Sequence, residues 1–139
     1  MRMAKYILAV FVGIMVGSLT VWAIEMLGHY FYPPPANIDF EDKAALEAFI
    51  FSAPTGAKLF IILAYALGSF IGGLLTQLIA QPKSFFLPFL TGAFLMAAGI
   101  INIINIPHPT WMIVSTLSVF LPFALTGAYL VRKKTGLKN

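Results

Sequence analysis

One stretch of the sequence, residues 57–80 (AKLFIILAYALGSFIGGLLTQLIA), constrains the fold more than any other. It carries a single charge, Lys58, and about 20 apolar residues are enough to cross the hydrocarbon core of a bilayer. Ala64, Gly68 and Gly72 recur every four residues and therefore share one helix face, where the missing side chains let another helix approach closely. The stretch predicts a membrane-embedded helix bundle.

The composition agrees with a membrane protein. Hydrophobic residues make up 60% of the 139 residues, charged residues only 10%, and the mean hydropathy is +0.90, whereas soluble domains are about 25% charged. The length leaves no room for a separate soluble catalytic domain. The absence of cysteine excludes disulfides, thiolate catalysis and iron–sulfur clusters.

The hydropathy pattern predicts an all-α membrane protein, a bundle of four transmembrane helices within a single domain. A cleavable signal peptide is the competing interpretation of the first apolar run, but that run exceeds the roughly 7–15 residues of a signal core. A long extracytoplasmic loop separates the first two spans. The predicted spans cover residues 6–28, 57–80, 85–104 and 110–131 of the chain 1–139, with the loop at 29–56.

The loop predicts a short helix of its own. Three prolines at 33–35 forbid continuation of the first span. Asp39 is a suitable N-cap for an amphipathic helix over residues 40–51, whose apolar stripe includes Leu46 and Phe49. Such a helix either lies in the membrane interface or covers the end of the bundle.

Small residues predict which spans pack together. Ala9, Gly13 and Gly17 in the first span repeat the four-residue spacing found in the second span. We therefore expect the first two spans to cross closely through Gly13, Gly17, Gly68 and Gly72. In the fourth span, Pro122 predicts a kink.

The basic residues predict the orientation. Seven of them fall on one side of the predicted membrane, without an acidic residue among them, so that this side is cytoplasmic by the positive-inside rule. Both termini are then cytoplasmic. The basic residues on this side are Arg2, Lys5, Lys83, Arg132, Lys133, Lys134 and Lys138.

A group of polar residues at the opposite side is the candidate site. Glu25 and His29 share a helix face, and Lys58, His108 and Asn105 are expected at a similar depth. The favoured interpretation is structural: Glu25 is ionised and paired with Lys58, with both histidines in the same hydrogen-bond network. The alternative is a metal site of Glu25, His29 and His108, because two histidines and a carboxylate can hold zinc or iron.

No motif of a catalytic site, phosphate loop or nucleotide fingerprint is present, and we expect no catalytic residues, no cofactor and no nucleic-acid partner. The leading hypothesis is a non-enzymatic membrane protein that acts as a homo-oligomer or as an accessory subunit of a membrane complex. One alternative is an oligomeric transporter of small solutes or ions, which requires a continuous polar path. The other is a metal-dependent membrane enzyme, which requires Glu25 and His108 to converge.

Three segments, residues 25–35, 68–73 and 106–111 (EMLGHYFYPPP, GSFIGG and IPHPTW), resemble a group of small bacterial four-span membrane proteins. The resemblance implies a location in the bacterial cytoplasmic (inner) membrane. It implies no activity, substrate or cofactor, and it makes Glu25, His29 and His108 the first residues to test.

Overall fold

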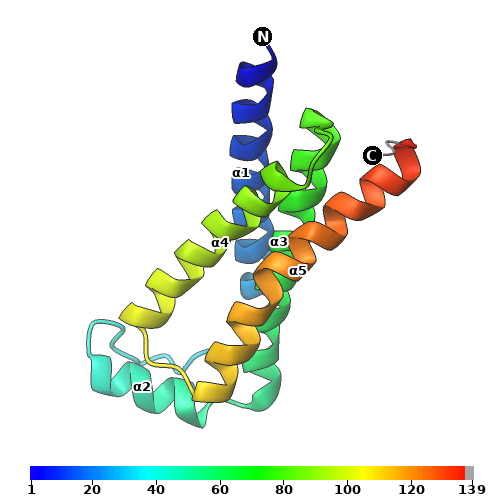
Figure 1. The fold of residues 1–139 in the computed structure, drawn as a ribbon. Helices are drawn as coiled ribbons and strands as arrows, with labels where there is room; N and C mark the ends of the chain where they lie inside the picture. Colours follow the sequence, from blue (N-terminus) through cyan, green and yellow to red (C-terminus); the bar gives the residue numbers. More distant parts are fainter. Residues whose placement is uncertain (137–139) are drawn as a thin grey trace.

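A computed structural model describes residues 1–136 of the chain, and within these residues the protein has five helices and no strand (Figure 1). The predicted all-α fold is confirmed. Lys138, one of the residues that predict the orientation, lies outside the described residues. The helices are α1 (Arg2–Phe31), α2 (Lys43–Ser52), α3 (Thr55–Ala80), α4 (Phe86–Asn105) and α5 (Thr110–Thr135).

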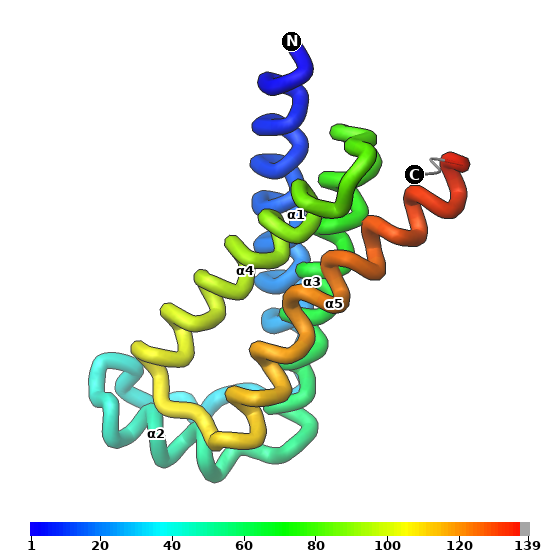
Figure 2. The backbone as a smooth tube through the Cα atoms, in the orientation of Figure 1, coloured from blue at the N-terminus to red at the C-terminus, as the bar shows by residue number. Residues whose placement is uncertain are grey.

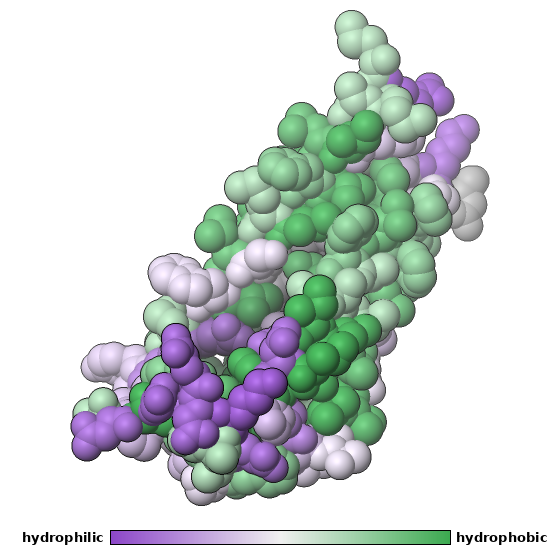
Figure 3. Space-filling model, turned by 90° about the vertical axis from the view of Figure 1, so that its left-hand side faces the viewer, coloured by the Kyte–Doolittle hydropathy of each residue, from purple (hydrophilic) through white to green (hydrophobic). Residues whose placement is uncertain are grey.

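Four of these helices, α1, α3, α4 and α5, are long and apolar enough to cross a membrane. Both ends of the described chain and the turn between α3 and α4 lie toward one end of the molecule, and α2 lies at the other (Figure 1). We call these the basic end, with Arg2, Lys5 and Lys83, and the acidic end, with Asp39 and Glu47. Hydrophilic atoms gather at the two ends and hydrophobic atoms between them (Figure 3). These features identify a multi-pass membrane protein.

The helix boundaries follow local sequence signals. α1 ends at Phe31, and a single residue, Tyr32, separates it from the proline run. α5 continues to Thr135, beyond the predicted end at 131, because the first residue suited to stop it is Gly136, which adopts a left-handed conformation with φ of 69°. Pro122 remains inside α5, which changes direction near its middle (Figure 2).

The interface between α1 and α3 is formed by backbone atoms. A Cβ atom on Gly13 would lie 2.7 Å from the Gly72 carbonyl oxygen, and one on Gly72 would lie 2.9 Å from the Gly13 carbonyl oxygen. Gly17 and Gly68 face each other in the same way, at 2.8 and 2.7 Å. No side chain larger than hydrogen fits at these four positions without moving a helix.

A second backbone interface, between α3 and α5, was not anticipated from the sequence. A Cβ atom on Gly73 would overlap the Ala124 carbonyl group, and one on Gly127 would overlap the Phe70 carbonyl oxygen. Ala124, Gly127 and Ala128 are all buried and lie at helical spacing, which is the signal that could have revealed this face. α3 contacts all three other spanning helices, whereas α1 and α5 do not contact each other.

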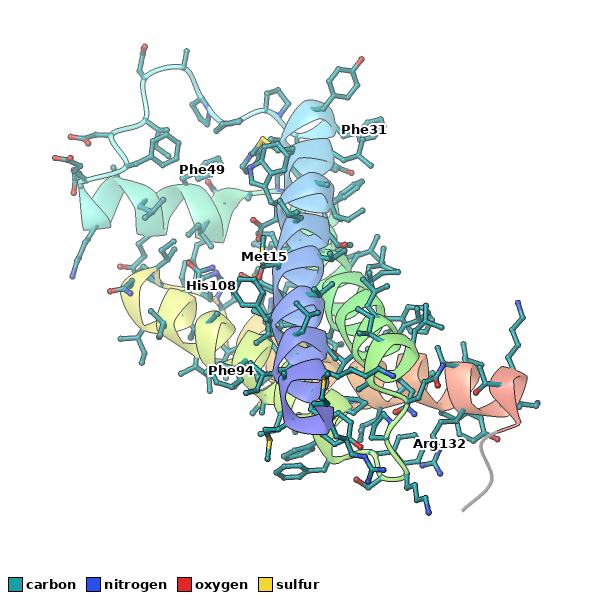
Figure 4. The ribbon with its side chains drawn as sticks, turned by 90° about the horizontal axis from the view of Figure 1, so that it is seen from above. Met15, Phe31, Phe49, Phe94, His108 and Arg132 are labelled. Atoms are coloured by element: carbon teal, nitrogen blue, oxygen red, sulfur yellow. The ribbon has the colours of Figure 1, made fainter. Side chains whose placement is uncertain are left out.

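The basic end of α5 is attached to the turn between α3 and α4. The guanidinium group of Arg132 lies over the Phe85 ring, 4.3 Å from its centroid, and Arg132 is 7% exposed. Figure 4 shows Arg132 far from Phe31, which lies at the opposite end of the molecule. A basic residue that the sequence assigns to orientation thus also takes part in helix packing.

The short helix α2 begins later than the sequence predicts. Its N-cap is Asp42, whose side chain accepts a hydrogen bond from the backbone N–H of Ala44 (3.0 Å). The predicted cap, Asp39, instead accepts from the backbone N–H of Glu41 (2.9 Å), two residues on. Both aspartates bind nearby backbone N–H groups, and only the second is followed by helical residues.

Candidate functional site

Polar side chains on one face of α3 line the interior of the bundle. Lys58, Tyr65, Ser69 and Thr76 are separated by seven, four and seven residues, which places them on a single helix face. Each is at most 8% exposed. The second predicted span therefore carries a glycine face and a buried polar face, and the polar face meets α4.

Tyr65 is at the centre of the polar contacts between α3 and α4. The Asn102 side-chain amide on α4 donates a hydrogen bond to the Tyr65 hydroxyl oxygen (2.8 Å). The Tyr65 ring packs on Phe120 of α5, with centroids 5.1 Å apart, and Leu95 belongs to the same buried group. One phenol group thus connects three spanning helices.

Glu25 approaches this group from α1. Its carboxyl group interacts electrostatically with the Tyr65 hydroxyl group, without a hydrogen bond between the two among residues 1–136. Glu25 is half-buried, and within residues 1–136 it forms no ion pair and no hydrogen bond. We call Glu25, Tyr65 and Asn102 the Glu25 cluster: a hydrogen bond joins Tyr65 and Asn102, and Glu25 interacts with Tyr65 through electrostatics.

The predicted ion pair between Glu25 and Lys58 is not formed among the described residues. The Lys58 ammonium group instead donates a hydrogen bond to the backbone carbonyl oxygen of Phe51 (3.1 Å). Phe51 lies in the last turn of α2, where carbonyl groups lack helical partners and the helix dipole favours a cation. Lys58 therefore attaches α2 to the first turns of α3.

Among the described residues, the histidines and Asn105 form no hydrogen bond with the Glu25 cluster. His29 is exposed, His108 contacts the Ile106 carbonyl oxygen through Nδ1, and Asn105 donates to the Ile101 carbonyl oxygen of its own helix (2.9 Å). In the part of the chain that the structure describes, no three His, Asp or Glu side chains are grouped closely enough to hold a metal ion. The geometry does not assemble the alternative metal site.

A second polar contact, nearer the basic end, joins three helices. The Thr76 and Thr91 hydroxyl oxygens lie 2.7 Å apart, between α3 and α4. Thr76 Oγ1 also lies 2.9 Å from the Gly72 carbonyl oxygen and 3.3 Å from that of Ala9 on α1. The sequence does not reveal this contact, because a threonine within an apolar run gives no sign of its partner.

The arrangement can hold helices together, and it carries one half-buried carboxyl group, that of Glu25, on α1. Among the described residues it contains no nucleophile paired with a base. The Leu95 and Phe120 side chains fill the interior between the two polar contacts.

Comparisons of the chain with family models, with curated proteins and with solved structures found no match, so that the bacterial family resemblance stays a prediction.

Proposed function

We propose that this protein is a non-enzymatic component of a membrane assembly, either a homo-oligomer or an accessory subunit of a larger complex. The observation that carries the proposal is the sparse packing of α2, which is attached to α3 by the hydrogen bond from Lys58 to the Phe51 carbonyl oxygen. Its 10 residues include no buried residue, and within residues 1–136 none of its Cα atoms comes within 8 Å of a Cα atom of another helix. Helices shorter than about 12 residues are marginal in water, so that α2 requires a further surface.

The exposed face of α1 supports the same proposal. In the most apolar 18-residue segment of α1, only 17% of the segment is buried inside the molecule. Large side chains follow one another along the uncovered surface, among them Phe11, Met15, Leu19 and Trp22, which are 48–60% exposed. Lipid tails or apolar helices of a partner can cover this face, whereas α2 lies at the end of the bundle, where a protein surface fits better.

Photo-crosslinking in native membranes tests the proposal. A photoreactive phenylalanine analogue replaces Phe51, which is 51% exposed on α2, and in a control variant it replaces Phe123, which is 40% exposed on α5. We expect position 51 to form an adduct of defined protein mass at higher yield than position 123. The mass then distinguishes a second copy from another subunit, and lipid adducts alone at position 51 would contradict the proposal.

We further propose that the basic end faces the cytoplasm of a bacterial cell and that α2 lies outside the cytoplasmic membrane. The positive-inside rule supports this orientation. The chain has no cysteine, so that single cysteines at Ser84 and Asn37 can be labelled without background. An impermeant reagent added from outside should modify position 37 alone. Modification of position 84 alone would show that the protein has the opposite orientation.

The Glu25 cluster favours a second candidate, an oligomeric ion transporter in which Glu25 takes up the ion or proton. An intramembrane carboxyl group without an ion pair is a functional candidate because its burial is unfavourable. Vesicles that contain the protein and a pH-sensitive dye test this. Glu25→Gln should abolish proton flux and Glu47→Gln, at the exposed acidic end, should not. Absence of flux in the unmodified protein would exclude proton transport, and equal flux in both variants would exclude Glu25 as the group that takes up the proton.

A further inference from the structure

A groove at the basic end separates α1 from the turn between α3 and α4 and from the first turns of α4. Its volume is about 1380 Å³, above the roughly 300–1,000 Å³ of a typical small-molecule pocket. It follows the first turns of α1 as far as Ile14 and ends where Gly13 packs against Thr76 and Thr91. The groove is thus open at the basic end and closed by the close contact between α1 and α3 at Gly13.

The lining of this groove changes from charged to apolar along its length. Arg2 and Lys5 of α1 and Lys83 of the turn lie at its mouth, and no acidic residue lines it. Deeper along the groove, α1 contributes Val10, and α4 contributes Phe94, which lies beside α1 in Figure 4. The order of these residues matches a molecule with an anionic head and an apolar tail.

We propose that this groove binds an anionic phospholipid, with its phosphate group at Arg2, Lys5 and Lys83 and an acyl chain along the apolar floor. Basic pockets between spanning helices are known to hold anionic head groups, because each cation near them contributes attraction and the tails remain in hydrocarbon. Charge complementarity argues against a second copy in the same groove, since a symmetric partner would bring a second basic mouth to the first.

The test measures lipid retention by native mass spectrometry of the whole protein, titrated with phosphatidylglycerol or with phosphatidylcholine. We expect one phosphatidylglycerol molecule per chain and no comparable retention of phosphatidylcholine. The double variant Lys5→Gln/Lys83→Gln should weaken phosphatidylglycerol binding about 30-fold, since each of the two cations near an anionic head group contributes about fivefold. The matched control is Lys133→Gln/Lys134→Gln, which removes two charges from the same end but outside the groove.

A steric variant separates the groove from general surface attraction. Leu90→Trp fills the apolar floor and keeps every charge, and it should also release phosphatidylglycerol. The substituted lysines are exposed, so that the charge variants are expected to fold even if the tryptophan variant does not. Equal weakening in the two lysine pairs, equal retention of both lipids, or a dimer that dissociates when Lys5 and Lys83 are replaced would each overturn the proposal.

Discussion

The two halves of α3 are packed in different ways. Toward the basic end its neighbours are backbone atoms: Gly68 and Gly72 meet α1, and Gly73 meets α5. Toward the acidic end its neighbours are rings and polar groups, with Tyr65 on Phe120 and Asn102. Both halves are buried, and glycines on α3 meet the backbone atoms of a neighbouring spanning helix in the first.

The difference matters because a bilayer provides no solvent exclusion to hold apolar helices together. Where backbones touch, close contact itself supplies the attraction and fixes the crossing point of the helices. Where rings and amides touch, the side chains can adopt other rotamers, and the polar groups can exchange partners. We call the half of α3 toward the basic end the glycine half and the half toward the acidic end the polar half. We expect substitutions in the glycine half to be more destabilising than substitutions in the polar half.

The largest effect is expected for Gly68→Leu, which would separate α1 from α3. A Cβ atom on residue 68 would lie 2.7 Å from the Gly17 carbonyl oxygen, and a leucine side chain has three further carbon atoms. We expect a loss of more than about 3 kcal/mol in the free energy of unfolding in detergent, at or above the upper end of overpacking costs. Ala97→Leu, at an exposed position of α4, is the control and should have little effect. If the thermal stability of Gly68→Leu were unchanged, this result would contradict the close interface between α1 and α3.

Gly73→Ala sharpens the comparison with one added methyl group. Its Cβ atom would overlap the Ala124 carbonyl group, which cannot move without α5, and we expect a loss of about 2–3 kcal/mol. In the control, Gly99→Ala, the added atom meets the far end of the Phe120 ring, which can turn aside. Equal destabilisation by the two changes would show that backbone and ring contacts are equally rigid.

Lys58→Met tests the polar half. It removes the hydrogen bond from the ammonium group to the Phe51 carbonyl oxygen, and such charged hydrogen bonds contribute about 1.5–3 kcal/mol. Because Glu25 is not the partner of Lys58, the effects of Glu25→Gln and Lys58→Met on thermal stability should add within about 0.5 kcal/mol. A coupling energy well above that value would indicate that Glu25 and Lys58 form the ion pair expected from the sequence.

The smallest effect is expected for the hydrogen bond between Asn102 and Tyr65. Interhelical hydrogen bonds in membranes contribute about 0.6 kcal/mol on average, and we expect a similar loss for Tyr65→Phe. Asn102→Leu should lose a similar amount, and the double variant should lose no more than either, because each change removes the same bond. A chemical-denaturation series of the three variants provides the measurement, and full additivity would show that the two groups act separately.

The sequence predicts the parts of this fold that depend on composition and spacing. A run of about 20 apolar residues is sufficient to indicate a span, and glycines four residues apart define a face whatever the partner. Gly13 and Gly17 could be matched with Gly68 and Gly72 because the glycines of the two spans have the same four-residue spacing and are expected at a similar depth in the membrane. The cluster of Ala124, Gly127 and Ala128 carried the same kind of signal for the α3–α5 interface.

Pairing between polar groups could not be predicted in the same way. Depth placed Glu25 and Lys58 at one level, but the rotation of each helix about its axis decides which groups meet, and hydropathy does not fix that rotation. Lys58 also had a competing acceptor, the Phe51 carbonyl group, which exists only because α2 ends at Ser52. The contact between Tyr65 and Asn102, 37 residues apart, has no local sequence signal.

The central place of α3 has a consequence for how the protein is made. Because α3 is the second spanning helix to be synthesised, its contact with α1 can form while α4 and α5 are still being translated. Those later helices then meet a surface that is already assembled, and α5 docks on α3 without touching α1. An insertion error in α3 would leave α1 and α5 connected only through α4, whereas the same error in α5 would leave the α1–α3 pair intact.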